Sequence, residues 1–294
     1  MKVLNYGSLN MDYVYTVDHM IREGETQSSS GLKTFCGGKG LNQSIALAKA
    51  GIPVYHAGIV GEDGDMLLEL CRDNGVDITY VKRLPVKGGH TVIQVDREEQ
   101  NSIILYGGTN QMQTEEDIDR VLNDFGAGDY LLLQNEINLL DYIIDRAYAK
   151  EMKIVLNPSP YNENLSECDL CKVSLFLLNE IEGEQMAGGS DENRILEHLA
   201  EKFPEAAFVL TLGKAGAVYF DGKEKIFQNI FEVETVDTTA AGDTFTGFFI
   251  ASLIRGEGVR AALRTAAKAS AVAVSRPGAA PSIPTMEEVE RGIS

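Results

Sequence analysis

The sequence is poor in cysteine, in basic residues and in long hydrophobic segments, and each deficit excludes a class of protein. Its four cysteines, Cys36, Cys71, Cys168 and Cys171, are too few for a disulfide scaffold and favour a reducing cytoplasm. The 26 Lys and Arg residues against 44 Asp and Glu residues leave a net charge of −18, which argues against nucleic acid as a partner. No apolar run reaches the roughly 20 residues of a membrane-spanning helix, and the first residues enter a strand without a signal-peptide segment. We therefore expect a cytoplasmic protein that binds neither nucleic acid nor a membrane.

Two common phosphate-binding signatures are also missing. The sequence has no G-x-x-x-x-G-K-[ST] segment, which excludes a P-loop, and no G-x-G-x-x-G after a strand, which excludes a Rossmann fingerprint. Cys168-Asp-Leu-Cys171 is a single C-x-x-C without a second pair or nearby histidines, so two incidental thiols are the default and a zinc or redox role is the alternative. A phosphorylated ligand is still compatible with the acidic chain, because backbone dipoles can override net charge locally.

What the sequence does contain is 44% hydrophobic residues and a regular alternation of strand and helix patterns. This alternation predicts one α/β domain over residues 1–294, a doubly wound and mostly parallel sheet with helices on both faces. Strands are expected at 2–7, 54–60, 130–134, 153–157, 175–178 and 208–212, and hairpins at 90–96 with 102–106 and at 218–220 with 225–227. Helices are expected at 42–50, 64–74, 115–124, 139–150, 180–186 and 191–202, and as a pair over 243–275.

Two segments, about 13–35 and about 87–107, interrupt this alternation with strand-like patterns. Their simplest interpretation is a small sheet that stands off the main body as a lid. In open α/β sheets, ligands bind beyond the carboxyl ends of the strands. Polar residues fall at or after predicted strand ends at Asn10, Asp12, Gln134, Glu136, Asn157, Asn179, Glu182 and Asp237. Their coincidence predicts a ligand site at that edge of the main sheet.

The most informative segment is Asp237-Thr-Thr-Ala-Ala-Gly-Asp-Thr-Phe-Thr-Gly-Phe-Phe-Ile-Ala251. Its apolar residues recur at helical spacing after Asp243, so residues 239–242 are expected to form a turn that opens a helix. The N–H groups of a first helical turn have no internal partners, and small residues there let a phosphate approach them. Asp243 would repel that phosphate unless it accepts a proton from an attacking hydroxyl. The alternative is an ordinary helix-capping acid.

Two other patterns each allow a functional and a structural interpretation. Gly37-Gly-Lys-Gly-Leu-Asn42 could bring the backbone close to a polar ligand with Lys39 and Asn42 as donors, or form a flexible turn with Asn42 as helix cap. Asn10 and Asp12 lie two apart in an extended segment and would face the same side. The pair suits a vicinal diol, and the alternative is an Asx turn.

A third pattern, Asn179-Glu-Ile-Glu182, places an amide and a carboxylate on one face of a first helical turn. Oxygen ligands of this kind suit Mg²⁺, and simple capping is the alternative.

Four motifs follow one another along the chain: Phe35-Cys-Gly-Gly-Lys-Gly-Leu-Asn-Gln43, Asn179-Glu-Ile-Glu182, Thr211-Leu-Gly213 and Asp237-Thr-Thr-Ala-Ala-Gly-Asp-Thr-Phe245. In this order they resemble the ribokinase (PfkB) family of sugar kinases, over essentially the whole chain. The last motif is the most specific, the segment ending at Gln43 favours the ribokinase branch, and residues 276–282 are a supporting C-terminal signature. The resemblance implies a three-layer αβα body with a β lid that often clasps a homodimer.

The resemblance also implies MgATP-dependent phosphorylation of the primary hydroxyl of a sugar, ribose to ribose 5-phosphate before others. Asp243 matches the catalytic base, and Ala240, Ala241 and Gly242 match the anion hole. The sugar pocket would comprise Asn10, Asp12, Gly38, Lys39, Gly40, Asn42, Glu136 and Asp243. The nucleotide would contact Asn179, Thr211, Leu212, Gly213, Gly216 and Gly242, with Asn179 and Glu182 holding Mg²⁺ through water. A monovalent cation, K⁺, would lie among Asp237, Thr239, Ala273, Arg276, Gly278 and Ser282.

The match is weakest in the lid, where residues 13–34 show no defensible correspondence, and at Leu41 and Ser44, where alanines are expected. Because lids close over the sugar, another pentose, a nucleoside or a sugar phosphate stays open as the substrate. A sugar phosphate would need cations near the lid, for which Arg22, Lys33 and Arg97 are candidates. A non-catalytic sugar or nucleotide sensor on the same fold is the competing class of function.

Overall fold

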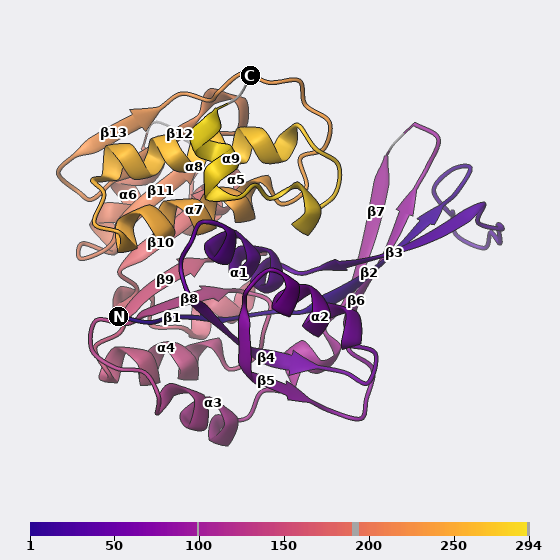
Figure 1. The fold of residues 1–294 in the computed structure, drawn as a ribbon, viewed down its shortest axis with the longest axis horizontal. Helices are drawn as coiled ribbons and strands as arrows, with labels where there is room; N and C mark the ends of the chain where they lie inside the picture. The colour runs from indigo at the N-terminus through magenta and orange to yellow at the C-terminus, as the bar shows by residue number, and fades with distance from the viewer. Residues whose placement is uncertain (99, 190–193, 293–294) are drawn as a thin grey trace.

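The chain forms a three-layer αβα body from which a smaller sheet projects (Figure 1). The structure is a computed structural model that describes residues 1–98, 100–189 and 194–292. Within those ranges nine strands form the main sheet in the order β13-β12-β11-β10-β9-β8-β1-β4-β5, and four form the small sheet in the order β3-β2-β6-β7. The main-sheet strands are β1 (Val3–Tyr6), β4 (Val54–Val60), β5 (Asp77–Arg83), β8 (Tyr130–Gln134), β9 (Lys153–Asn157), β10 (Leu175–Asn179), β11 (Ala207–Thr211), β12 (Ala217–Phe220) and β13 (Lys225–Gln228).

All pairings from β11 to β5 are parallel, and the two pairings of β12 are antiparallel. The central strands read as apolar runs because both faces are covered, and alternate residues enter different cores. In β8, Leu132 packs in one core, whereas Leu131 and Leu133 pack in the other. The expected doubly wound α/β class is therefore confirmed.

The helices divide between these two cores, one layer on each face of the main sheet (Figure 1). One layer contains α1 (Lys39–Lys49), α2 (Asp65–Asp73), α7 (Ala241–Ile254), α8 (Val259–Val274) and α9 (Met286–Arg291). The other contains α3 (Glu115–Leu122), α4 (Leu140–Ala149), α5 (Glu180–Ala187) and α6 (Ile195–Lys202). Short 3₁₀ turns complete the connections at Gly108–Gln111, Glu163–Glu167, Leu170–Lys172, Gly213–Ala215 and Ala280–Ser282.

The small sheet contains β2 (Asn10–Thr16), β3 (Gly31–Gly37), β6 (Gly89–Val95) and β7 (Asn101–Tyr106), and it extends away from the body (Figure 1). Strand β2 pairs antiparallel with β3 and parallel with β6, and β6 pairs antiparallel with β7. The two segments that interrupt the alternation in the sequence therefore come together in one sheet, as expected. This sheet is joined to the body where β2 follows β1 and where β3 runs into α1.

Several local expectations were wrong. The edge strand β5 and helix α9 were not foreseen, and α1 begins at Lys39 rather than at Asn42. Asp237 lies in the long connection between β13 and α7 rather than at a strand end, whereas Asn10 and Asp12 lie in an extended segment as expected, inside β2. Of the helix expected over 191–202, residues 191–193 lie outside the described residues, and α6 spans Ile195–Lys202.

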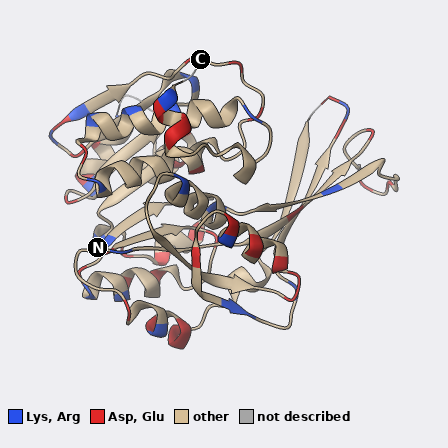
Figure 2. Ribbon diagram, viewed as in Figure 1, with Lys and Arg blue, Asp and Glu red and all other residues tan. Residues whose placement is uncertain are grey.

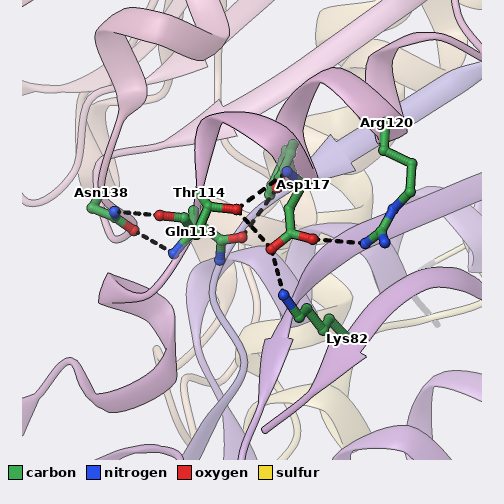
Figure 3. A network of polar contacts seen from close by, with 7 residues as sticks. Lys82, Gln113, Thr114, Asp117, Arg120 and Asn138 are labelled. Carbon is green, nitrogen blue, oxygen red and sulfur yellow. Dashed lines mark hydrogen bonds and ion pairs between the residues drawn. The ribbon is translucent and has the colours of Figure 1, made fainter.

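A polar cluster ties the edge strand β5 to helix α3 (Figure 3). Asp117 accepts hydrogen bonds from Lys82 of β5 at 2.6 Å and from Arg120 at 2.8 Å, while Thr114 caps α3. Burial opposes the charge of Asp117, but these donors hold its pKa below the usual range. Gln113 lies next to this cluster and accepts a hydrogen bond from Tyr6 at 3.0 Å. In the described part of the chain, no helix is long and apolar enough to cross a membrane.

Candidate active site

The candidate site is a cavity of about 220 Å³ at the carboxyl ends of β9, β10 and β11. Parallel strands deliver their last residues to one edge of a sheet, which is why polar residues from separate segments meet there. Asn157, Asn179 and Thr211 end these three strands and line the cavity. The rest of the lining is formed by Lys39, Ser159, Leu177, Leu178, Glu182, Thr238, Ala240, Ala241, Gly242, Asp243 and Thr246. The motifs that are far apart in the sequence thus contribute to one space.

The N-terminus of α7 forms one wall of this cavity. Ala240 precedes the helix with φ 59°, a left-handed conformation that is uncommon for a residue with a side chain and that tends to occur at functional sites. In the described residues no side chain caps this helix: the N–H of Ala241 donates to the carbonyl of Thr238 at 3.2 Å, and the next N–H groups, those of Gly242 and Asp243, have no partner there. A Cβ on Gly242 would enter open space, and glycine therefore keeps the backbone approachable. This end of α7 can receive an anion.

Asp243 lies in the first turn of α7 but does not cap it. Its Oδ2 accepts a hydrogen bond from Asn42 Nδ2 at 3.0 Å, and its Oδ1 accepts one from Gln43 Nε2 at 2.9 Å. Both donors come from α1. Asp243 therefore does not act as an ordinary capping acid of α7. Asn42 is likewise inside α1 rather than its cap.

Close packing of α1 against α7 makes these hydrogen bonds reachable. A Cβ on Gly247 would lie 2.4 Å from the Cβ of Ala46, so a residue larger than glycine would push the helices apart. At the start of α1, a Cβ on Gly40 would lie 2.4 Å from the backbone nitrogen of Ser8. Helix α1 is therefore held tightly by the β1–β2 connection at its start and by α7 near Ala46.

Lys39, the first residue of α1, stands among three carboxylates. Burial opposes its charge, but Asp243, Glu136 and Glu182 hold the pKa of Lys39 above its usual value. Glu136 accepts the backbone N–H of Lys39 at 3.0 Å and a short hydrogen bond from Ser8 Oγ, both through Oε2. Burial raises the pKa of Glu136, although Lys39 counteracts this. The site therefore places one ammonium group among acids next to the uncapped end of α7.

Asn10 and Asp12 project from one face of β2, as expected from their spacing. Asn10 Oδ1 accepts a hydrogen bond from Asn110 Nδ2 at 2.7 Å, which leaves the Asn10 amide group as a donor. Asp12 Oδ1 accepts a hydrogen bond from Thr91 Oγ1 at 2.5 Å, and burial raises the pKa of Asp12. Their orientation is set by residues on the connection after β7 and on β6.

Asn179 and Glu182 form a capping box at the start of α5. Asn179 Oδ1 accepts the N–H of Glu182 at 2.9 Å, and the Glu182 carboxylate accepts from the backbone and the amide of Asn179, both at 3.0 Å. The structural alternative for this motif is therefore present, and Glu182 nevertheless lines the cavity. Beyond Thr211, the residues Leu212, Gly213 and Gly216 form a turn outside the lining of the cavity.

Of the six expected cation ligands, three are joined through Asp237, and Ala273 and Arg276 form a separate hydrogen-bonded pair. Asp237 accepts from Thr239 N at 2.8 Å and Thr239 Oγ1 at 2.6 Å, and from Gly278 N at 2.9 Å. Burial opposes the charge of Asp237, but these bonds hold its pKa below the usual value. The carbonyl of Ala273 accepts the N–H of Arg276 at 3.1 Å, and Ser282 donates to Ala279 at 2.7 Å. Asp237 therefore holds its turn through local hydrogen bonds, which is the structural alternative to a role as a cation ligand.

Sequence reasoning missed the residues that orient the site from behind. Gln43, Ser8, Thr91 and Asn110 were not among the expected site residues, although Gln43 belongs to the quoted motif. Their common signal is burial of a polar side chain, which appears only once the strands are paired. Among the described residues, no group of three or more His, Cys, Asp or Glu side chains is arranged to hold a metal ion.

Comparisons with known proteins agree with this fold. Residues 1–286 match the model of the pfkB family carbohydrate kinases. A ribokinase from Bacillus subtilis is 34% identical over 98% of this chain and 98% of its own length. A deoxyribokinase from Salmonella typhimurium is 30% identical over 100% of this chain and 99% of its own length. The structure of an Arabidopsis thaliana ribokinase with ribose and ATP superposes with a TM-score of 0.89 at 29% identity, covering 99% of this chain and 97% of that one.

Proposed function

Because the chain belongs to the pfkB family of carbohydrate kinases, we propose that it transfers the γ-phosphate of ATP to the primary hydroxyl of D-ribose, forming ribose 5-phosphate. The activity as an ATP-dependent sugar kinase follows from the family. The choice of ribose rests on relatives named ribokinases and on the structural similarity to a ribokinase bound to ribose and ATP. A relative named deoxyribokinase at 30% identity makes 2-deoxyribose the second candidate acceptor.

The observation that carries the mechanism is the position of Asp243 beside the uncapped end of α7. A hydroxyl that hydrogen-bonds to Asp243 would lie next to N–H groups able to receive the transferring phosphate. Phosphoryl transfer depends mainly on positioning and on charge stabilisation, so few reactive groups are needed. In this proposal Asp243 accepts the hydroxyl proton, and Ala240, Ala241 and Gly242 form the anion hole.

The nucleotide is proposed to lie along the ends of β10 and β11, against Asn179 and Thr211. Mg²⁺ would neutralise charge on the phosphates when bound. Glu182 suits a water-mediated contact with it, because both carboxylate oxygens already accept hydrogen bonds from Asn179. The nucleotide is also proposed to contact the adjoining turn at Leu212, Gly213 and Gly216. Lys39 can approach the transferring phosphate or the sugar from the opposite wall.

The sugar is proposed to bind between Lys39 and β2, over Gly38, Gly40, Asn42 and Glu136. Asn10 can donate and Asp12 can accept, a combination that suits two adjacent hydroxyls. The pocket residues on β2 belong to the small sheet, so closing of that sheet as a lid would bring them onto the sugar.

The first prediction concerns Asp243. Asp243→Asn keeps the size of the side chain but replaces one acceptor oxygen with an NH₂ group and removes the proton acceptor, and we expect kcat to fall about 10²–10⁴-fold. The KM for ATP is expected to stay nearly constant in a coupled assay of ADP release. Asp73→Asn, at an exposed position in the last turn of α2, is the matched control and should behave like the wild type. Turnover close to wild type in Asp243→Asn would contradict the mechanism.

The second prediction concerns the sugar. Asp12→Ala is expected to raise the KM for ribose tenfold or more, because an unpaired hydroxyl costs about 1–3 kcal/mol. The KM for ATP should change little. Removing the contacted hydroxyl from the sugar should lower kcat/KM less for the variant than for the wild type. Asp18→Ala is the control: Asp18 follows the same strand and forms an exposed ion pair with Arg97.

A panel of ribose, 2-deoxyribose, other pentoses, a ribonucleoside and a sugar phosphate ranks the acceptors by kcat/KM. Ribose ranked first would support the proposal, and a different leading acceptor would replace ribose. Binding of sugar without ADP release from any acceptor would instead favour a sensor.

We further propose that K⁺ binds beside the anion hole, near Asp237, Thr239 and the loop of Arg276 and Gly278. This loop runs next to the turn that carries Ala240, and its backbone carbonyls are the kind of ligand that a large monovalent cation accepts. Ala273 and Ser282 complete the proposed ligand set. A cation there would neutralise Asp237 and stiffen the turn whose N–H groups receive the phosphate.

We expect kcat in K⁺ to exceed kcat in Na⁺ or in a bulky organic cation severalfold at constant ionic strength, because preorganised donors matter most where charge develops. K⁺ should also raise the melting temperature. Asp237→Ala should abolish both differences. Asp221→Ala is a matched control, since Asp221 likewise accepts backbone N–H groups in a turn, at 3.0 and 2.7 Å. Identical rates in all three salts would remove the cation from the mechanism.

The small sheet is also proposed to pair with that of a second copy of the chain. Its strands carry few charges (Figure 2), and Ile103 and Ile104 of edge strand β7 are 58% and 62% exposed. Exposed apolar edge strands are prone to pair with another chain. Sedimentation as a monomer at assay concentrations would contradict this dimer.

We propose the cytoplasm as the site of the reaction, where ATP and free thiols are both expected.

A further inference from the structure

Gln43 has no place in the proposed chemistry, yet it contacts the proposed base directly. Its side chain is fully buried, and its Nε2 lies 2.9 Å from Asp243 Oδ1 and 3.2 Å from Asn157 Oδ1. Asn42 donates to the other Asp243 oxygen at 3.0 Å. Two amides from consecutive residues of α1 thus hold the two oxygens of one carboxylate.

A buried chain of amides stands behind Gln43. Gln134 Nε2 donates to Gln43 Oε1 at 2.7 Å and to Asn5 Oδ1 at 3.0 Å. Asn5 Nδ2 donates to the carbonyl of Gly40 at 2.7 Å and to Ser44 Oγ at 2.8 Å. Asn5, Gln134 and Gln43 are all completely buried, so none of these groups can turn to solvent.

The backbone carbonyl of Gly40 sets the direction of this chain. A carbonyl can only accept, so the amide nitrogen of Asn5 must face Gly40 and its oxygen must face Gln134. The nitrogen of Gln134 then faces the oxygen of Gln43. Each amide orientation is decided by its neighbour, and the chain ends with an N–H donor pointing at Asp243.

A second carbonyl imposes the same direction from the other side. Asn157 Nδ2 donates to the carbonyl of Leu177 at 2.8 Å, which turns Asn157 Oδ1 toward Gln43. Rotating the Gln43 amide by half a turn would place its oxygen against two oxygens and its nitrogen against that of Gln134. Buried like partners of this kind are costly, so only one orientation is compatible with the surroundings.

We propose that Gln43 is a positioning residue for Asp243, and that the chain Asn5–Gln134–Gln43 fixes it as a donor. The Gln43 amide occupies Asp243 Oδ1 and sets the rotation of the carboxylate. Oδ2, the oxygen shared with Asn42, then faces the sugar hydroxyl and accepts its proton. This inference rests on the proposed role of Asp243 as the base.

The test is Gln43→Met, which keeps an unbranched side chain of similar length and removes the amide. We expect kcat to fall about 10–10²-fold, since small misplacement of a reacting group has effects of this order. The KM values for ribose and ATP should stay within about twofold, because Gln43 is not proposed to contact either ligand. In the Asp243→Asn background the same substitution should cause no further loss, because its effect passes through that carboxylate.

Gln134→Met tests the direction of the chain two side chains away from Asp243. Without Gln134, Gln43 Oε1 loses its buried donor and the amide is held only by the acceptors on its nitrogen, so its position is less fixed and kcat should fall with KM again unchanged. This variant also stands in if Gln43→Met does not fold. Gln113→Met is the matched control, since it replaces another buried glutamine in the polar cluster drawn in Figure 3, and its kcat should equal that of the wild type.

The outcomes separate this inference from the proposed function. If Asp243→Asn is inactive while folded Gln43→Met or Gln134→Met keeps wild-type kcat, the positioning role is wrong and the mechanism stands. An equal loss of kcat in Gln113→Met would also overturn it, because the effect would then come from any buried glutamine. If Asp243→Asn itself turns over normally, the proposed mechanism fails first.

Discussion

The close contact between α1 and α7 is the constraint on which the site depends. Gly247 lets α7 approach Ala46 closely, and one turn nearer the N-terminus of α7 this approach brings Asp243 within hydrogen-bonding distance of Asn42 and Gln43. The two helices lie in the same layer but come from opposite ends of the chain. A wider separation would leave Asp243 in the first turn of its helix with no partner to orient it.

The acidic chain handles phosphate through local geometry rather than net charge. With a net charge of −18, the molecule as a whole repels anions. The anion site proposed here instead uses N–H groups at the end of α7, together with one ammonium group. Lys39 stays charged because Asp243, Glu136 and Glu182 outweigh the effect of its burial. Two of these carboxylates have hydrogen-bond partners of their own, Ser8 for Glu136 and Asn179 for Glu182.

Much of the architecture could be predicted from local patterns. Apolar runs at 130–134 and 153–157 coincide with strands β8 and β9, because strands that are buried on both faces consist mostly of apolar residues. The small sheet was foreseen as an interruption of the alternation. Edge strand β5 was missed because it is partly exposed and mixes polar with apolar residues, so it lacks a continuous apolar run. The start of α1 was missed because glycine-rich segments predict turns rather than helices. In the structure Glu136 accepts the backbone N–H of Lys39, the first residue of this helix.

The family, the α/β class and the polar residues Gln134, Asn157 and Asn179 at the carboxyl ends of strands follow from residue types and their order. Which of those residues contact one another depends instead on how the elements pack. Gln134 and Asn157 mark strand ends in the sequence, but their role as neighbours of Gln43 requires that β8, β9 and α1 be packed together. The direction of an amide depends on the groups around it, and those groups come from distant segments that meet only in the folded chain.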